Sequence, residues 1–246
     1  MRAAKNIAIV TALLVVTTSC GKITKTPKAS SITHSTLQAT IAADNALGQQ
    51  IVLVSGDLPT GWVEQSVAPL SASALAVAKQ SAKLLDTCIN LPPSENSFYA
   101  LVSGSVFKNG SDTIGSAVSF FRSSSTFSQY FAGVQDPTHA NCLANVLNAS
   151  YVQSLKVKLK NENVVVNSTL SLIPGFGVGK EAYALRVTTD VVSPAPLTVT
   201  TDTIGFAKGN AIVAMTFRYP GSLPPLDLEQ SLLSKLLSHT NAFVKN

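Results

Sequence analysis

Apolar residues recur with a period of two over much of the second half of the chain. Four such stretches, Val164–Ile173, Glu181–Thr189, Leu197–Phe206 and Ala211–Arg218, are separated by turn residues and predict strands. Two more alternating runs flank the dipeptide Asn109-Gly110, which is typical of a hairpin turn. Because hairpin-linked strands run in opposite directions, this pattern predicts an antiparallel sheet.

Helical spacing of apolar residues appears between and after these strands. The expected helices cover Leu75–Ile89, Phe127–Val134, Cys142–Leu147 and a final segment that begins at Asp227. The short apolar run Ile51–Val54 predicts the first strand, and after the turn at Gly56–Gly61 a strand is expected to continue over Trp62–Val67. The expected order β-α-ββ-αα-ββββ-α predicts an α+β fold, an antiparallel β-sheet with amphipathic helices packed on it.

The N-terminus has the three parts of an export signal. Arg2 and Lys5 give a basic start, Ile7–Val16 is apolar, and the small residues Thr17–Ser19 lead directly to Cys20. Small residues before a cysteine resemble a bacterial lipobox, in which the chain is cleaved before the cysteine and the sulfur carries a diacylglycerol. We therefore expect a signal peptide at 1–19 and lipidation of Cys20. Ordinary secretion, with Cys20 as a spare thiol, is the alternative.

The segment that follows is rich in Ser, Thr, Ala and Lys. It predicts a flexible tether over residues 20–46, followed by a single α+β domain over 47–246. No second apolar run reaches about 18 residues, which argues against a multispan membrane protein. We expect an exported protein held by its lipid on the outer face of the cell membrane.

The formal charge of +5 is concentrated near the N-terminus. From residue 47 onward the chain has 13 Lys and Arg against 12 Asp and Glu, a balance of +1. Only Lys156, Lys158 and Lys160 cluster, and their alternate spacing on a strand would give one small solvated stripe. Nucleic-acid binding requires basic residues gathered on one face, so we expect no nucleic-acid partner.

Cys88 and Cys142 remain once Cys20 is set aside. An exported compartment is oxidising, so an even pair predicts a disulfide. The alternative is a thiol nucleophile, because His139 precedes Cys142 by three residues and the two would share one face of a helix.

Several local features together resemble a known family. They are the turn Leu58–Trp62, a helix that ends at Cys88, a hairpin that ends in Ala117–Arg122, a helix with Cys142 and a late block of strands. The chain resembles small actinobacterial lipoproteins related to the extracellular sensor domain of the mycobacterial kinase PknH and to Mog1/PsbP-like domains. The resemblance covers about residues 47–243 and implies an α+β sandwich outside the membrane, with a cleft and no catalytic residues to transfer.

Motifs for catalysis or for metal binding are missing from the sequence. The run Gly175-Phe176-Gly177 has neither the glycine spacing nor the Ser or Thr of a phosphate-binding loop, and no helix follows it. We interpret Gly175, Phe176, Gly177 and the lone tryptophan, Trp62, as the candidate rim of a ligand cleft. Core packing of Trp62 is the alternative for that residue. We expect no metal and no cofactor.

The leading hypothesis is a non-catalytic, lipid-anchored extracytoplasmic domain of the bacterial cell envelope, ligand-binding or sensor-like. Its partner would be a small or hydrophobic ligand or an envelope protein. The alternatives are an envelope assembly or interaction protein without a small-molecule site, and a hydrolase or thiol enzyme.

Overall fold

Seven strands form one antiparallel sheet in the computed structural model, which describes residues 34–65, 84–91, 98–121, 127–159, 163–173, 182–193 and 196–243. The strand order is β1-β2-β3-β7-β6-β5-β4. The strands are β1 (Val63–Gln65), β2 (Phe98–Asn109), β3 (Asp112–Phe121), β4 (Val165–Leu172), β5 (Ala182–Ser193), β6 (Leu197–Lys208) and β7 (Ala211–Pro220). The helices with printed bounds are α1 (His34–Ile51), α3 (Phe127–Gln135), α4 (Ala140–Leu159) and α5 (Leu226–Phe243), and the short 3-10 turns are η2 (Ser55–Asp57) and η3 (Pro137–His139). The predicted α+β class is confirmed.

Two of the expected hairpins have tight turns in which glycine supplies a left-handed backbone. Asn109 pairs with Asp112 around Gly110, which has a φ of 59°. Lys208 pairs with Ala211 around Gly209, which also has a φ of 59°. Residues with a Cβ rarely adopt this conformation, so the two glycines fix where β2 and β6 end.

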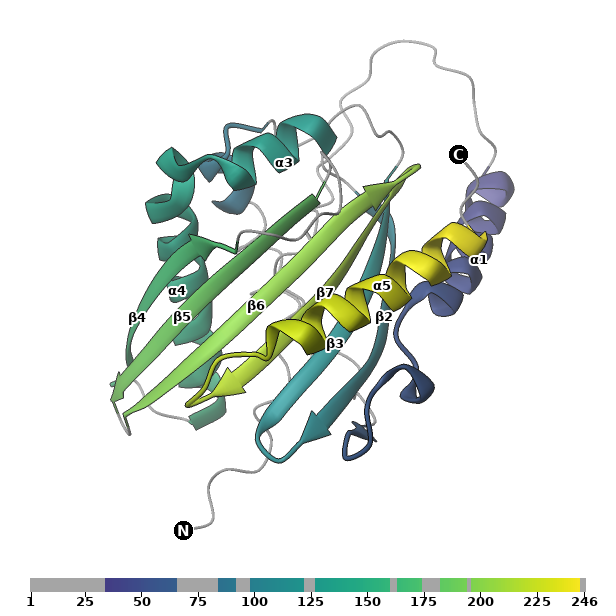
Figure 1. The fold of residues 1–246 in the computed structure, drawn as a ribbon. Helices are drawn as coiled ribbons and strands as arrows, with labels where there is room; N and C mark the ends of the chain where they lie inside the picture. Colours follow the sequence, from purple (N-terminus) through teal and green to yellow (C-terminus); the bar gives the residue numbers. More distant parts are fainter. Residues whose placement is uncertain are drawn as a thin grey trace.

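Helices cover both faces of the sheet (Figure 1). On one face, α1 and α5 pack over an apolar layer that includes Val102, Ile204, Val213 and Leu232. On the opposite face, α3, α4 and residues 84–91 enclose a second apolar cluster. Its largest side chains are Phe121, Phe127, Tyr130, Phe131 and Tyr183.

Helix α1 corrects the expected N-terminal boundary. It begins at His34, so the expected flexible tether is wrong for residues 34–46; residues 20–33 lie outside the described residues. The stretch has few large apolar side chains because its packing face uses Ile41 and Leu47 around Gly48, a position where the helix lies very close to the sheet. The helix packs through a few positions and is otherwise exposed, so its composition resembles that of a linker.

The expected strand at Ile51–Val54 is also wrong, whereas the strand expected over Trp62–Val67 is found as β1 (Val63–Gln65). Ile51 ends α1, and Val52 and Leu53 continue as an irregular segment that is buried in the same apolar layer as the helix. The backbone N–H of Leu53 donates to Ser116 Oγ at 2.9 Å, which ties this segment to β3. A short apolar run is equally compatible with a buried connection and with a strand, and here the connection is what forms.

The remaining differences concern helix lengths. Residues 84–88 are helical, in agreement with the end of the helix expected before Asn90, and residues 66–83 lie outside the described part. Helix α4 extends to Leu159, beyond the expected end at Leu147. Lys156 and Lys158 therefore lie on a helix and not on a strand, where their spacing would have placed them on one face.

Gly48 provides a test of how α1 packs. A Cβ at this position would lie 2.5 Å from Val102 Cγ2, so we expect Gly48→Ala to lower the free energy of unfolding by about 1–3 kcal/mol. In an unobstructed helix the same change would raise stability by up to about 1 kcal/mol. Urea denaturation measures the sign of the change in the free energy of unfolding. Gly56→Ala is the control, because a Cβ at that position would meet open space. A stabilised Gly48→Ala protein would contradict the close contact between α1 and β2.

Candidate functional site

The disulfide joins the two cysteines for which it was predicted. Cys88 and Cys142 are bonded, with their Cα atoms 5.6 Å apart, and the bond links residues 84–91 to α4. Because the Cys142 sulfur is bonded, it is not available as the nucleophile of the alternative thiol-enzyme hypothesis. His139 has a structural contact of its own, with Nδ1 2.9 Å from the carbonyl oxygen of Gly133.

A cluster of charged side chains lies on the α5 side of the sheet. Asp202, on β6, is fully buried, and Arg186, directly opposite it on β5, is about one-quarter exposed. Arg186 Nε donates to Asp202 Oδ1 at 2.8 Å and Arg186 Nη2 donates to Asp202 Oδ2 at 2.5 Å. Two parallel hydrogen bonds of this kind hold the planar guanidinium and carboxylate groups in a fixed relative orientation.

Glu229, in the first turn of α5, completes the cluster. Its side chain is fully buried, and neither carboxyl oxygen has a hydrogen-bond partner of good geometry. Burial and the adjacent Asp202 raise the pKa of Glu229 to about 9, against a smaller opposing effect of Arg186. Glu229 is therefore uncharged at neutral pH, and its proton faces a carboxylate.

The sheet surface that continues from this cluster toward β4 is polar. Its β4 residues are exposed, whereas Thr200 and Asp202 on β6 are buried. In register across β4, β5 and β6 are three rows of three polar residues, and no apolar side chain interrupts them. The rows are Asn167, Asp190 and Thr198; Thr169, Thr188 and Thr200; and Ser171, Arg186 and Asp202. Figure 1 shows α5 crossing β7 and β3, and no described helix lies over β4 and β5 on this side. We call these nine residues the polar face.

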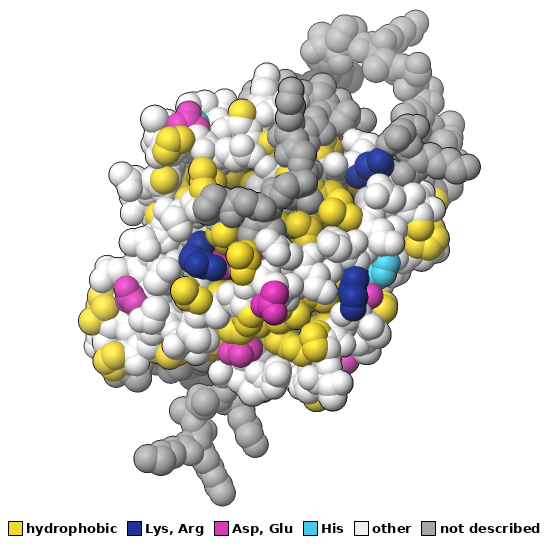
Figure 2. All heavy atoms as spheres, in the orientation of Figure 1, with side chains coloured by type: hydrophobic (Ala, Val, Ile, Leu, Met, Phe, Trp, Pro, Cys, Tyr) yellow, Lys and Arg dark blue, Asp and Glu magenta, His cyan; other side chains and the backbone are white. Residues whose placement is uncertain are grey.

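Charged side chains are sparse on this side of the molecule. Figure 2 shows a few scattered basic and acidic groups among uncharged polar and backbone atoms and groups of hydrophobic side chains. Within the polar face, Thr198 Oγ1 donates to Asp190 Oδ1 at 2.6 Å, so the exposed carboxylate is also held in place. The face presents hydroxyl groups in fixed positions more than it presents charge.

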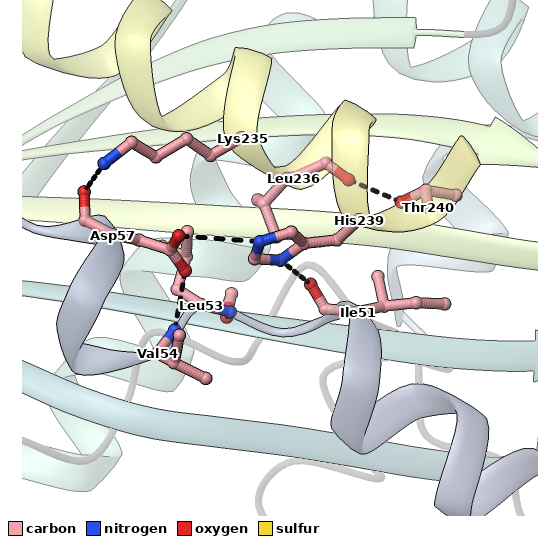
Figure 3. A network of polar contacts seen from close by, with 9 residues as sticks. Ile51, Leu53, Val54, Asp57, Lys235, Leu236, His239 and Thr240 are labelled. Carbon is pink, nitrogen blue, oxygen red and sulfur yellow. Dashed lines mark hydrogen bonds and ion pairs between the residues drawn. The ribbon is translucent and has the colours of Figure 1, made fainter. Parts of the chain in front are cut away.

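A second polar network anchors the other end of α5 (Figure 3). His239 Nε2 lies 3.5 Å from Asp57 Oδ1, and His239 Nδ1 lies 3.1 Å from the carbonyl oxygen of Ile51. Asp57 Oδ2 accepts from the backbone N–H of Val54 at 2.8 Å, and Lys235 Nζ donates to the carbonyl oxygen of Asp57. Helix α5 is thus attached to the turn that follows α1.

The predicted cleft rim is only partly in view. Trp62 is half-buried and packs against the core layer under α1 and α5, as its alternative interpretation expected. Gly175, Phe176 and Gly177 lie outside the described residues, and so does Cys20. Trp62 precedes β1 at one edge of the sheet, whereas Gly175–Gly177 follow β4 at the other edge, so a rim shared by the two segments stays a prediction.

Sequence reasoning missed the cluster around Glu229, although one signal was present. Glu229, Leu232, Leu233 and Leu236 follow the i, i+3, i+4, i+7 spacing of a buried helix face. A carboxyl group on such a stripe predicts a perturbed, functionally interesting residue. Its partners Asp202 and Arg186 could not be found in this way, because their pairing depends on the register between β5 and β6.

Neither a metal centre nor a membrane-spanning helix is found in the part of the chain that the structure describes. No group of three or more His, Cys, Asp or Glu side chains there is arranged to hold a metal ion. No helix among the same residues is both long and apolar enough to cross a bilayer.

The disulfide is expected to contribute strongly to stability. The two cysteines are 54 residues apart, and closing a loop of that length contributes about 4 kcal/mol in the chain-entropy treatment. We expect the double variant Cys88→Ala/Cys142→Ala to unfold at a clearly lower urea concentration than the oxidised protein. Reduced wild-type protein is the control and should match the variant. Equal midpoints for variant and oxidised protein would contradict the prediction.

The Arg186–Asp202 pair gives a second prediction. Arg186→Gln leaves the buried Asp202 carboxylate without its counter-ion, so we expect a loss of about 3–5 kcal/mol in the free energy of unfolding. Arg186→Lys keeps the charge but loses the paired hydrogen bonds. Its free energy of unfolding should lie between those of the wild type and of Arg186→Gln. Replacing both partners, as in Arg186→Met/Asp202→Leu, should recover part of the loss. If Arg186→Gln were as stable as the wild type, the pair would have no structural role.

Comparison with known proteins matches no family model and no curated protein sequence. Among solved structures, the chain is similar to the extracellular domain of PknH from Mycobacterium tuberculosis, with a TM-score of 0.41 and 10% sequence identity. The match covers 80% of this chain and 96% of that one.

Proposed function

We propose that this chain is a non-catalytic, lipid-anchored extracytoplasmic domain that binds a hydroxyl-rich ligand of the cell envelope, such as a glycan, on its polar face. The observation that carries the proposal is the polar array across β4, β5 and β6, nine residues in register of which seven are at least partly exposed, while Thr200 and Asp202 form its buried edge. The apolar ligand considered from the sequence fits this surface less well.

The residue types on the polar face suit binding. Threonine and serine side chains are short, and threonine is restricted about χ1, so they lose little conformational entropy when a ligand orders them. The long side chains of Lys and Glu cost more entropy to order than those of Ser and Thr. Arg186, held by Asp202, adds a guanidinium whose position is fixed before a ligand arrives.

Export is supported by two independent features of the chain. The N-terminal pattern that ends at Cys20 is that of a lipoprotein signal, and the bond between Cys88 and Cys142 is typical of an oxidising compartment. An enzyme is not favoured, because the paired cysteine removes the one candidate nucleophile that the sequence offered.

Binding is tested with insoluble cell walls isolated from the organism that produces the protein. We expect the wild-type protein to sediment with the walls, and Ser171→Lys or Thr188→Lys to reduce the bound fraction at least fivefold, because a long charged side chain would disrupt the hydroxyl array. Ser103→Lys is the matched control, since Ser103 is an exposed strand serine outside the polar face. Equal sedimentation of all four proteins would exclude the polar face as the binding surface. Binding of an envelope protein in place of the glycan would favour the alternative interaction protein.

Anchoring is tested separately by fractionating cells. We expect Cys20→Ala to move the protein from the membrane fraction to the soluble or secreted fraction, because the diacylglycerol would have no sulfur to modify. Mass spectrometry of the N-terminal peptide reports the modification directly. If Cys20 of the wild-type protein is unmodified, the anchoring hypothesis is wrong and ordinary secretion is favoured.

A further inference from the structure

Arg186 uses only part of its hydrogen-bonding capacity on Asp202. A guanidinium group carries five N–H groups. Nε and one N–H of Nη2 donate to the Asp202 carboxylate, which leaves three N–H groups, one on Nη2 and two on Nη1. No described residue accepts a hydrogen bond from these three groups. The guanidinium thus has an inner edge that is bound to Asp202 and an outer edge that is available to a ligand.

The outer edge of Arg186 belongs to the exposed part of the polar face. The Arg186 side chain is about one-quarter exposed and Asp202 is fully buried, so a ligand that approaches from solvent meets the cation first. Ser171 lies directly opposite Arg186 on β4, and Thr188 lies two residues along β5 on the same face. Both are at least partly exposed, and neither hydroxyl group is hydrogen-bonded to a described residue. Unused donors and hydroxyl groups therefore lie together at this end of the polar face.

Charge is distributed unevenly along the polar face. Asp190 lies four residues after Arg186 on the same face of β5, about 13 Å away along the strand. Its carboxylate is exposed, with one oxygen held by Thr198. Arg186 is the one basic residue among the nine that form the polar face. A negative group on a ligand is therefore attracted to the Arg186 end and repelled from the Asp190 end.

We propose that the outer edge of Arg186 binds a carboxylate of the ligand, so that the glycan on the polar face is an acidic one, such as a polymer that contains uronic acids. The inference rests on the proposed function, because it names the chemical class of the ligand for the same surface. A planar carboxylate can accept two parallel hydrogen bonds from Nη1 and Nη2, the geometry that suits arginine. Asp202 fixes the guanidinium in advance, so less conformational entropy is lost when the ligand binds.

A carboxylate suits this site better than a phosphate monoester does. A phosphate monoester carries about −1.5 to −2 charges at neutral pH and would require more than one cation. Arg186 has no Lys or second Arg beside it among the nine residues of the polar face, and Asp202 already balances part of its charge. A single negative charge at the Ser171 end, with uncharged hydroxyl groups extending toward Asp190, matches the arrangement.

The first experiment compares two soluble polymers that differ in charge. Polygalacturonate carries a carboxylate on each sugar, and its methyl ester has the same backbone without that charge. We expect the wild-type protein to bind polygalacturonate at least tenfold more tightly than the ester in isothermal titration calorimetry, with a smaller ratio at high salt. Polygalacturonate should also release the protein from isolated cell walls. Equal binding of both polymers, or binding of neither, would overturn the proposal, and so would release by a phosphorylated mannan but not by polygalacturonate.

A matched pair of variants tests Arg186 without breaking its bond to Asp202. Ser171→Asp places a carboxylate opposite Arg186, where it would occupy the outer edge, and Ser171→Asn has nearly the same size without the charge. Ser171 is exposed on an edge strand, so both variants should fold. We expect Ser171→Asp to bind polygalacturonate at least tenfold more weakly than Ser171→Asn. Asp190→Asn should bind it at least as tightly as the wild type, because a repelling charge is removed. Equal affinities of the two Ser171 variants would contradict the role of Arg186.

These results distinguish the acidic ligand from the proposed function itself. Loss of wall binding in Ser171→Lys reports on the hydroxyl array, whereas the difference between Ser171→Asp and Ser171→Asn reports on the charge of the ligand. A wild-type protein that sediments with cell walls and does not bind polygalacturonate would reject the acidic ligand alone. A protein that prefers polygalacturonate to its ester and does not sediment with cell walls would reject the cell-wall glycan and retain the carboxylate site at Arg186.

Discussion

The bond between Arg186 and Asp202 is the constraint around which one half of the sheet is arranged. A fully buried carboxylate requires a partner, and the two guanidinium hydrogen bonds supply it only when β5 and β6 are in the register that places these residues opposite each other. Burial and the neighbouring Asp202 raise the pKa of Glu229, and Arg186, whose hydrogen bonds are directed at Asp202, opposes them only in part. The pairing of two strands thus contributes to the protonation of a helix residue.

Different kinds of side chain cover the two faces of the sheet. One cluster beneath α3 is rich in aromatic rings, with Phe121, Phe127 and Phe131 meeting edge to face, and it is closed by the disulfide. The opposite face combines aliphatic packing under α1 and α5 with buried charges and then, toward β4, with open hydroxyl groups. The face beneath α3 is thus held by aromatic packing and a disulfide. The face beneath α1 and α5 carries apolar, charged and hydroxyl side chains.

Much of the fold could be predicted from sequence because its strands alternate and its hairpins carry glycine or Asn-Gly turns. Local patterns were sufficient for β2, β3, β6 and β7 and for the final helix. They failed for α1, where a glycine-centred contact with Val102 replaces the large apolar stripe that usually marks a buried helix. They also failed for Ile51–Val54, because a run of four apolar residues does not distinguish a strand from a buried connection.

The candidate site was less predictable than the fold, for a physical reason. The cysteine pair could be proposed by counting, since an exported chain with two remaining cysteines has only one internal bond to form. The polar face and the Arg186–Asp202–Glu229 cluster instead bring together residues from three strands and a helix, and their meeting depends on tertiary register. Trp62, conspicuous as the only tryptophan, is instead packed against the core.

The early start of α1 limits how far the domain can stand from its proposed anchor. Between Cys20 and His34 there are 14 residue steps, which span at most about 50 Å when fully extended. A lipid on Cys20 would therefore keep the first turn of α1 within that distance of the bilayer. A ligand bound by this protein would have to lie in a layer close to the membrane. The length of the segment between Cys20 and His34 would therefore set the greatest distance from the membrane at which the domain begins.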